Sequence, residues 1–510
     1  MLSLASQLLL AAAIQAPADS VPLYPDLGDH HHAISTRIAS TQEYFNQGVR
    51  LTYGFNHGEG IRSFREGARR DPGCAMCRWG EALAFGPNIN GAMDSASGAA
   101  AWNAIRKAVE LAPQANPKEQ GYIRALALRY GPDPLARRSQ RDTAYAEAMV
   151  ALAARYPQDD DAAVLAADAL MNLSPWDYYL PSGAPKANGA RALTLLERVL
   201  ERSPDHAGAC HFFIHAVEAV APERAVPCAE RLPSLMPGAG HIVHMPAHIY
   251  IRVGRYDDAI ENNLHAVHAD EEHIADMAPD ATYRLGYYPH NYHFLWFAAT
   301  MAGREETAIA AATKVAAKTN RDLLLEPGLG ALQHYLVTPL FAQVRFQRWT
   351  GVLETPAYDG KLVYANAIRH YARALAYSAR GTFDAAEREL ALLRQAAASP
   401  AIEGATIWGI NSWRAVLGIA VQAAAGDIAL KRGETDKAIA IFEQGVRLED
   451  ALTYDEPPTW HLSVRLQLGE ALLKAGRKED ARRVYAEDQK RHPNNVWSTS
   501  GGQAAGRSVR

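Results

Sequence analysis

The sequence has little net charge and no long apolar run. Its 52 Lys and Arg residues nearly balance 56 Asp and Glu residues, which leaves a net charge of −4 over 510 residues. A basic surface for a phosphate backbone or anionic lipid is therefore not expected, which argues against nucleic-acid binding. No stretch after the N-terminus is long and apolar enough to predict a membrane span. Hydrophobic residues make up 48% of the chain and charged residues 21%, as in a soluble protein.

Cysteine is also scarce. The four cysteines fall into two candidate pairs, Cys74 with Cys77 and Cys210 with Cys228. Arg78 follows the C-x-x-C motif where covalent haem attachment needs His, and the βαβ context of a thioredoxin-like motif is missing. Each pair is therefore interpreted as a disulfide or as two buried thiols, and the sequence leaves the choice open.

Several signatures of catalysis are missing. The chain has no G-x-x-x-x-G-K-S/T phosphate loop, no H-E-x-x-H helix and no G-x-S-x-G nucleophile elbow. The E-x-x-H pairs of di-iron helical bundles are absent from its histidine-rich region. The sequence alone leaves it open whether the chain is an enzyme.

The N-terminus indicates export. A short apolar run, Leu8 to Ile14, precedes Ala16-Pro17-Ala18, which is typical of a signal-peptide cleavage site although no Lys or Arg comes before the run. We predict a signal peptide over residues 1–18 and a periplasmic or secreted protein, with an apolar N-terminal helix as the alternative. Residues 19–40 form an arm that carries GDHHHA, Gly28 to Ala33. These histidines belong to a mobile segment, or the arm folds back and supplies extra ligands or a lid.

A helical repeat organises the rest of the chain. Strand signals are scarce, and Ala- and Leu-rich helical patterns are broken by Gly or Pro every fifteen or so residues. A glycine is followed by an alanine five residues later at Gly254/Ala259, Gly303/Ala308, Gly381/Ala386, Gly433/Ala438 and Gly476/Ala481. Gly permits a tight turn, Ala lets two helices approach, and a large residue four beyond, such as Phe442 or Tyr485, fills the space beside it. This pattern predicts helical hairpins that must stack to bury their apolar faces.

Three segments carry a family resemblance. LKAGRKEDARRVYAEDQKRHPNN, Leu473 to Asn495, and YIRVGRYDDAIENNLHA, Tyr250 to Ala266, resemble tetratricopeptide repeats. FNHGEGIRSFREGARRDPGCAMCRWG, Phe55 to Gly80, is a degenerate version. The resemblance implies an all-α, right-handed α-solenoid over residues 41–495, in which the first helix of each repeat lines a concave groove. It also implies a protein-binding scaffold as the usual function. The Gly/Ser-rich residues 496–510 are predicted to form a flexible tail.

Histidines recur in phase with the repeat. HFFIHAVEA and HMPAHIYIR share the H-x-x-x-H spacing, 33 residues apart. Counted back from the turn of each repeat, the first histidine is ten residues and the second six residues away, and one further histidine keeps the ten-residue place. These groove-facing positions are His211, His215, His244, His248 and His293. Glu218 shares a helix face with the first pair.

This pattern predicts a transition-metal site within residues 206–300, with those five histidines as ligands. Imidazoles suit copper, zinc or iron, and we expect copper first, then zinc and iron. Glu218 is a ligand, an acceptor that fixes a histidine tautomer, or a general base in a metal-dependent oxidoreductase or hydrolase. Pro246 complicates the site, because a helix that starts at Met245 or Pro246 would leave His244 in the preceding loop.

Other residues are candidates for binding a ligand. His241 and His290 share a place near the expected groove mouth, and GYYPHNYHFLWFAA, Gly286 to Ala299, contributes Tyr287, Tyr288, Tyr292 and Trp296. These aromatics wall a pocket, or they form the buried face of a helix. WDYY, Trp176 to Tyr179, begins an insertion that is a candidate lid over the groove.

Two function classes remain. The first is an exported repeat protein whose groove holds a metal and a small-molecule or peptide ligand, either as an enzyme or as a metal store. The alternative is a metal-free scaffold that binds a peptide or a partner protein, with the histidines and tyrosines as contacts.

Overall fold

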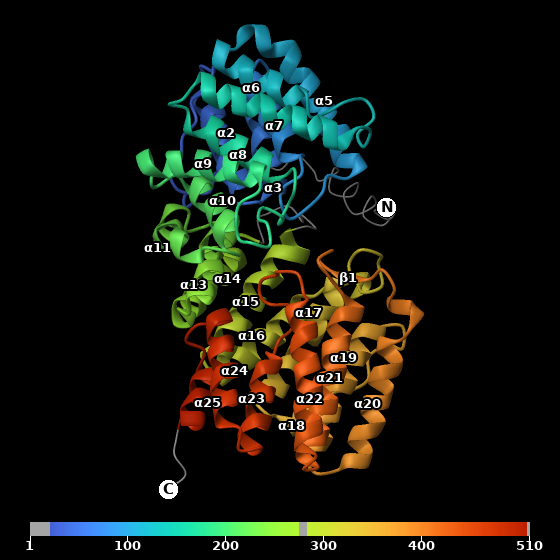
Figure 1. Ribbon diagram of the computed structural model, residues 1–510. Helices are drawn as coiled ribbons and strands as arrows, with labels where there is room; N and C mark the ends of the chain where they lie inside the picture. The colour runs from blue at the N-terminus through green and yellow to red at the C-terminus, as the bar shows by residue number, and fades with distance from the viewer. Residues whose placement is uncertain (1–20, 275–282, 507–510) are drawn as a thin grey trace. The chain divides into compact units, whose positions relative to one another are not determined.

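The computed structural model describes residues 21–274 and 283–506 (Figure 1). The predicted signal peptide, residues 1–18, lies outside the described residues. The chain divides into two compact units, and the boundaries between them fall within three helical elements, so each unit takes two segments. The first unit is Met1–Ile249 with Leu264–Arg284, and the second is Tyr250–Asn263 with Leu285–Arg510.

The first unit is built from antiparallel helical pairs. Neighbours along the chain such as α2 and α3, α4 and α5, and α7 and α8 pack against each other. Its helices are α2 (Ala39–Tyr53), α3 (His57–Arg70), α4 (Ala75–Ala84), α5 (Ser95–Leu111), η1 (Ala112–Gln114), α6 (Pro117–Ala127), α7 (Arg138–Arg155), α8 (Asp160–Met171), α9 (Ala187–Arg202), α10 (Ala207–Val217), η2 (Pro222–Ala225), α11 (Val226–Leu235) and α12 (Gly240–His244). The unit boundary falls within α13 (Pro246–Val253) and α14 (Tyr256–His273).

The second unit repeats the same hairpin. The pairs α15 with α16, α19 with α20, α21 with α22, and α23 with α24 lie side by side (Figure 1). Its elements are η3 (Tyr283–Tyr287, whose first two residues belong to the first unit), α15 (Tyr288–Met301), α16 (Glu305–Lys318), η4 (Arg321–Leu323), α17 (Ala331–Arg345), α18 (Trp349–Glu354), α19 (Val363–Ala379), α20 (Phe383–Ala397), η5 (Pro400–Ile402), β1 (Thr406–Ile407), β2 (Asn411–Ser412), α21 (Trp413–Lys431), α22 (Thr435–Asp450), α23 (Val464–Lys474), α24 (Lys478–Arg491) and α25 (Val496–Gly506). Within the described ranges, the only strands are the short antiparallel pair β1 and β2. The all-α fold of stacked helical hairpins predicted from the sequence is thus confirmed.

The predicted turn glycines have the conformation that the hairpin needs. Gly254, Gly303, Gly381, Gly433 and Gly476 all have φ between +70° and +84°, the left-handed region that favours glycine. The five paired alanines are fully buried, with no exposed surface. The aromatic after the alanine fills the predicted space, because a Cβ added to Gly426 would lie 2.4 Å from the Phe442 ring. The repeat pattern therefore describes real packing.

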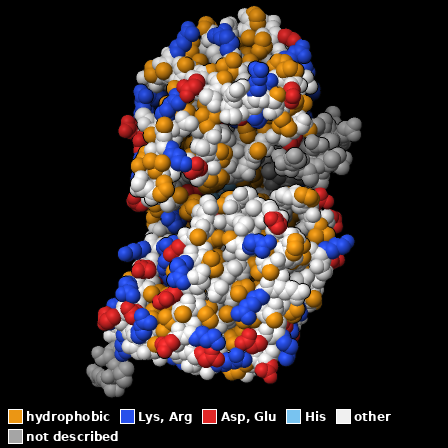
Figure 2. All heavy atoms as spheres, turned by 45° about the vertical axis from the view of Figure 1, so that its right-hand side comes forward, with side chains coloured by type: hydrophobic (Ala, Val, Ile, Leu, Met, Phe, Trp, Pro, Cys, Tyr) orange, Lys and Arg blue, Asp and Glu red, His pale blue; other side chains and the backbone are white. Residues whose placement is uncertain are grey.

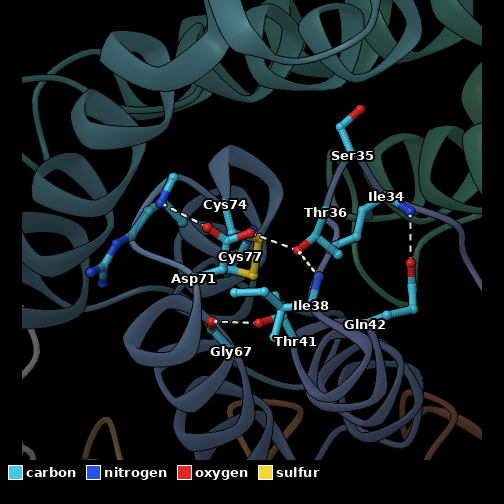
Figure 3. The surroundings of a disulfide bond; sticks show 12 residues. Ile34, Ser35, Thr36, Ile38, Thr41, Gln42, Gly67, Asp71, Cys74 and Cys77 are labelled. Atoms are coloured by element: carbon cyan, nitrogen blue, oxygen red, sulfur yellow. Dashed lines mark hydrogen bonds between the residues drawn. A yellow bond between two sulfur atoms is a disulfide. The ribbon is translucent and has the colours of Figure 1, made fainter.

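The N-terminal arm folds back on the first helices. Thr36 donates a hydrogen bond to Asp71 at 2.6 Å, beside a disulfide between Cys74 and Cys77 (Figure 3). One candidate cysteine pair is thus a disulfide, whereas the other, Cys210 and Cys228, consists of free buried thiols. The sequence left open whether the arm is mobile or folds back, and the structure shows the folded-back arrangement for residues 21–38.

The predicted flexible tail differs from the structure. Residues 496–506 form helix α25. Asn495 accepts hydrogen bonds from the backbone of Trp497 and Ser498, so it caps the first turn, and the Trp497 indole donates to the carbonyl of Thr300 at 2.8 Å. Tertiary packing and this cap offset the poor helix propensity of the Gly/Ser-rich segment.

The charges on the surface and the scarcity of long apolar helices among the described residues agree with the composition of the sequence. On the face drawn in Figure 2, Lys and Arg side chains are interspersed with Asp and Glu. One described helix, α21, is long and apolar enough to cross a membrane by length and composition, and 61% of its apolar window is buried inside the fold. Core packing accounts for that hydropathy.

Candidate metal centre

Helix α10 carries the first pair of predicted ligands. All its residues are buried, and the four-residue spacing puts His211 and His215 one turn apart on the same face, with ring centroids 4.9 Å apart. The side chain of His206 caps the start of the helix by accepting from the backbone N–H of Ala209 at 3.2 Å. The two imidazoles are therefore held on a rigid element inside the first unit.

His211 has a fixed tautomer. Its Nδ1 lies 2.6 Å from the backbone oxygen of Tyr53, and a carbonyl only accepts hydrogen bonds. Nδ1 therefore carries the proton, and Nε2 has the lone pair. Nε2 is buried and hydrogen-bonds to no residue in the described part of the chain. A buried lone pair that accepts no hydrogen bond is suited to binding a metal ion.

His215 has the same arrangement with a carboxylate as acceptor. Its Nδ1 donates to Oε1 of Glu218 at 3.2 Å, so its Nε2 also has a lone pair and makes no hydrogen bond within residues 21–274 or 283–506. The other oxygen of Glu218 lies 2.6 Å from Nδ1 of His248. Glu218 thus lies against two histidines at once, through a hydrogen bond with His215 and an ion-pair contact with His248.

His241 joins the first pair. The potential ligand atoms of His211, His215 and His241 all lie within 4.8 Å of one another, and all three side chains are buried. The ring of His241 lies 5.0 Å from that of His211. The sequence pattern predicts His241 as a ligand-binding residue at the groove mouth, and the fold places it with His211 and His215 in one group of side chains that could hold a metal ion.

His244 and His248 form a second pair beside these three. Their Nε2 atoms are 3.0 Å apart and form a hydrogen bond, in which one ring donates to the other. The helix breaks at Met245, because Pro246 has no N–H and its ring crowds the carbonyl four residues earlier. The position of Pro246 suggested that His244 would lie in a loop. In the structure His244 is instead the last residue of α12.

Aromatic rings enclose the histidines. The Phe55 ring stacks on His215 and His241 at centroid distances of 6.0 and 5.5 Å, and it lies 4.5 Å from His211. Trp176, from the predicted lid segment, meets His215 edge-on at 5.2 Å. These rings exclude water from the imidazoles, which strengthens electrostatic interactions there.

Burial sets the protonation of the cluster. Desolvation, together with the nearby His215, holds the pKa of His211 well below its usual range, and desolvation also lowers the pKa of His215. Burial alone would raise the pKa of Glu218, but His248 and His215 outweigh it and lower that pKa. At neutral pH His211 and His215 are therefore neutral and Glu218 is ionised, as metal coordination by these histidines requires.

The remaining predicted residues belong to the second unit. The His293 ring stacks on Trp296 at 5.0 Å and packs against Tyr335 and His334, and the ring of His290 meets Phe294 edge-on. The aromatic candidates Tyr287, Tyr288, Tyr292 and Trp296 are all buried, as expected for the packed face of a helix. The metal-ligand role of His293 and the ligand-binding roles of His290 and these aromatics stay predictions.

Two contributors were not found from the sequence. Tyr53 acts through its backbone carbonyl, which carries no residue-specific signal, and it is 158 positions from His211. Phe55 has a φ of +56°, a turn conformation that only its place before the Asn56 helix cap would have suggested. Tyr53 ends α2 and Phe55 lies in the turn after it, so only the packing of α2 against α10 brings them to the histidines.

Comparison with known proteins yields structural neighbours only. No family model matches the chain, and no curated protein matches it in sequence. The fold is similar to the P58(IPK) TPR domain (11% identity, TM-score 0.23, 92% of this chain and 97% of that one). It is also similar to a human IFIT1 dimer with m7Gppp-AAAA (12%, 0.32, 92% and 90%) and to yeast Tom70 (10%, 0.30, 91% and 88%). Every TM-score is below 0.5, so these likenesses carry no argument, and the chain's own stacked helical hairpins define it as a helical-repeat protein.

Proposed function

We propose that this helical-repeat protein binds a transition-metal ion in the first unit through His211, His215 and His241, with His244 and His248 as adjoining ligands. The observation that carries the proposal is the pair of buried Nε2 lone pairs on His211 and His215. Each is made available because the other ring nitrogen donates to an oxygen acceptor. Such acceptors orient the ligands in most histidine metal sites.

The donor set narrows the metal. A donor set of nitrogens without thiolates is not the usual one for structural zinc sites or iron–sulfur clusters. It also disfavours calcium and magnesium, which prefer oxygen ligands. Among divalent first-row ions, copper binds such nitrogen sites most tightly. We therefore propose copper first, with zinc and iron as the other candidates.

Glu218 is proposed as a positioning residue. Its two carboxylate oxygens lie 3.2 Å and 2.6 Å from the Nδ1 atoms of His215 and His248. An oxygen already occupied in this way is poorly placed to take a proton from a bound water. These contacts support metal binding. A redox or hydrolytic reaction at the ion would have to be demonstrated by turnover that is lost when the same histidines are replaced.

The test is metal content. The untagged full-length protein is loaded with Cu²⁺ or Zn²⁺, desalted, and analysed by mass spectrometry beside His215→Ala and His211→Ala. We expect each variant to lose about one equivalent. The exposed His265→Ala is the matched control and should bind as the wild type does. Equal metal content in all four proteins would contradict the proposal and favour the metal-free scaffold.

A further inference from the structure

A second histidine cluster lies elsewhere in the first unit, around Asp161 in the first turn of α8. Its members come from separate segments: His30 from the N-terminal arm, Tyr53 from the end of α2, and His206 from the start of α10. The side chains of Asp161, His206 and His30 are 10%, 4% and 17% exposed. The potential ligand atoms of His30, Asp161 and His206 all lie within 4.8 Å of one another.

Two groups anchor the carboxylate. The Tyr53 hydroxyl donates to Oδ1 of Asp161 at 2.6 Å, and Nδ1 of His32 hydrogen-bonds to Oδ2 at 2.6 Å. These contacts fix the orientation of the carboxylate, as the acceptors and donors around metal ligands do.

The other two histidines behave differently. Nε2 of His30 and Nε2 of His206 lie 3.0 and 3.3 Å from Oδ1 of Asp161. Both nitrogens are buried, yet neither has the geometry of a hydrogen bond to any described residue. Ligand atoms on one zinc or iron ion are separated by about 3 Å and aim at the ion, not at one another. The distances and the failed hydrogen-bond geometry together fit such an arrangement.

We propose that His30, His206 and Asp161 form a second site, which binds a first-row divalent transition-metal ion. Two histidines and one carboxylate are the donor set of many iron(II) and zinc sites that keep coordination positions open. The GDHHHA segment then has a specific purpose, because the arm brings one ligand to two helices.

The arm is held in the position that this site needs. Arg50 donates to the backbone oxygen of His30 at 2.8 Å, and Gln42 donates to that of His32 at 2.8 Å. The neighbouring His31 is exposed and contacts Asn46 at 2.8 Å. Adjacent histidines of one motif therefore have different environments, and only His30 and His32 reach Asp161.

One contact opposes metal binding at His206. Its Nδ1 accepts the Ala209 N–H at 3.2 Å, so coordination through Nε2 moves the ring proton to Nδ1 and removes this cap. A single cap hydrogen bond contributes much less than the binding of a divalent ion at a multi-ligand site, so coordination outweighs its loss.

The experiment uses the full chain stripped of metal and titrated with Co²⁺ alone, whose visible absorption reports coordination by nitrogen and oxygen. Bound metal is counted after desalting in the wild type, in His30→Ala and in the matched control His31→Ala. We expect His30→Ala to lose about one equivalent and His31→Ala to lose none. Asp161→Asn is the second variant, with circular dichroism to check folding.

The outcomes separate this site from the proposed centre at His211 and His215. If the His215→Ala variant still binds one equivalent of metal, and the added change His30→Ala removes that equivalent, the second site is supported. If the metal depends on His30 but not on His215, the second site stands and the proposed function fails. If His30→Ala folds and binds as much metal as His31→Ala, the cluster is only a buried ion-pair network and the inference is overturned.

Discussion

The carbonyl oxygen of Tyr53 accepts a hydrogen bond from Nδ1 of His211 at 2.6 Å, so a backbone group of α2 orients a histidine of α10. The hydroxyl of the same tyrosine donates to Asp161 at 2.6 Å. One residue thus holds the candidate metal centre through its backbone and the second cluster through its side chain. The two contacts can be separated by mutation.

Tyr53→Phe should leave the first centre intact, because the carbonyl that holds His211 remains. The lost hydrogen bond to a buried carboxylate should lower the free energy of unfolding by about 1–3 kcal/mol, measured by urea denaturation. Tyr145→Phe is a control, because the buried Tyr145 hydroxyl makes no hydrogen bond within the described ranges and its removal should cost little. Loss of the metal that depends on His215 in Tyr53→Phe would argue against this separation.

Glu218→Gln should weaken metal binding without removing a ligand. An amide offers one acceptor oxygen, whereas the carboxylate faces Nδ1 of both His215 and His248. We expect the Kd, measured by chelator competition, to rise about 10- to 100-fold. The exposed Glu223→Gln should bind as the wild type does. An unchanged Kd in Glu218→Gln would show that this carboxylate does not orient the ligands.

Asp168 should make stability fall as pH rises. Burial raises its pKa from 3.8 to about 6, although Arg129 and a hydrogen bond from Asn172 oppose the shift. Between these values the folded protein binds a proton that the unfolded chain has released, so the free energy of unfolding decreases with pH across this window. Asp168→Asn lacks this effect, and relative to wild type it should gain up to about 3 kcal/mol between pH 3.5 and pH 7.

The measurement for Asp168 is urea unfolding of both proteins over that pH range. Comparing the two removes the contribution of the other titrating groups. Parallel curves would mean that Asp168 titrates as it does in water and that its burial has no energetic consequence.

Phe442→Ala should destabilise the second unit. The ring is fully buried over Gly426, where no side chain can fill the space that it leaves. We expect a loss of about 3–5 kcal/mol in the free energy of unfolding. Leu392→Ala, at a residue that is 45% exposed, should change it by less than about 0.5 kcal/mol. Similar losses in the two variants would contradict the packing described for this repeat.

Local patterns predicted the fold well. The turn glycines and their paired alanines, such as Gly433 and Ala438, report contacts within one hairpin, so a single sequence contains the information. The pairing of His211 with His215 follows from helix geometry in the same way. Helix α25 was missed because its cap and its contact with Thr300 outweigh a Gly/Ser-rich composition.

The site was predicted only in part, because its remaining contacts join distant segments. His241 was assigned to a groove mouth from its place in the repeat, which does not predict the contact of its ring with His211 of α10. The histidines of the arm reach Asp161 from positions about 130 residues away, as for His32. Neither repeat phase nor motif spacing contains such long-range pairings.

The most direct test of the central claim is an anomalous difference map, recorded at the metal absorption edge from crystals of the full chain loaded with Cu²⁺ or Zn²⁺. The account predicts a peak about 2.0–2.1 Å from Nε2 of both His211 and His215. A metal-loaded crystal that diffracts well and shows no peak within bonding distance of these two nitrogens would contradict it.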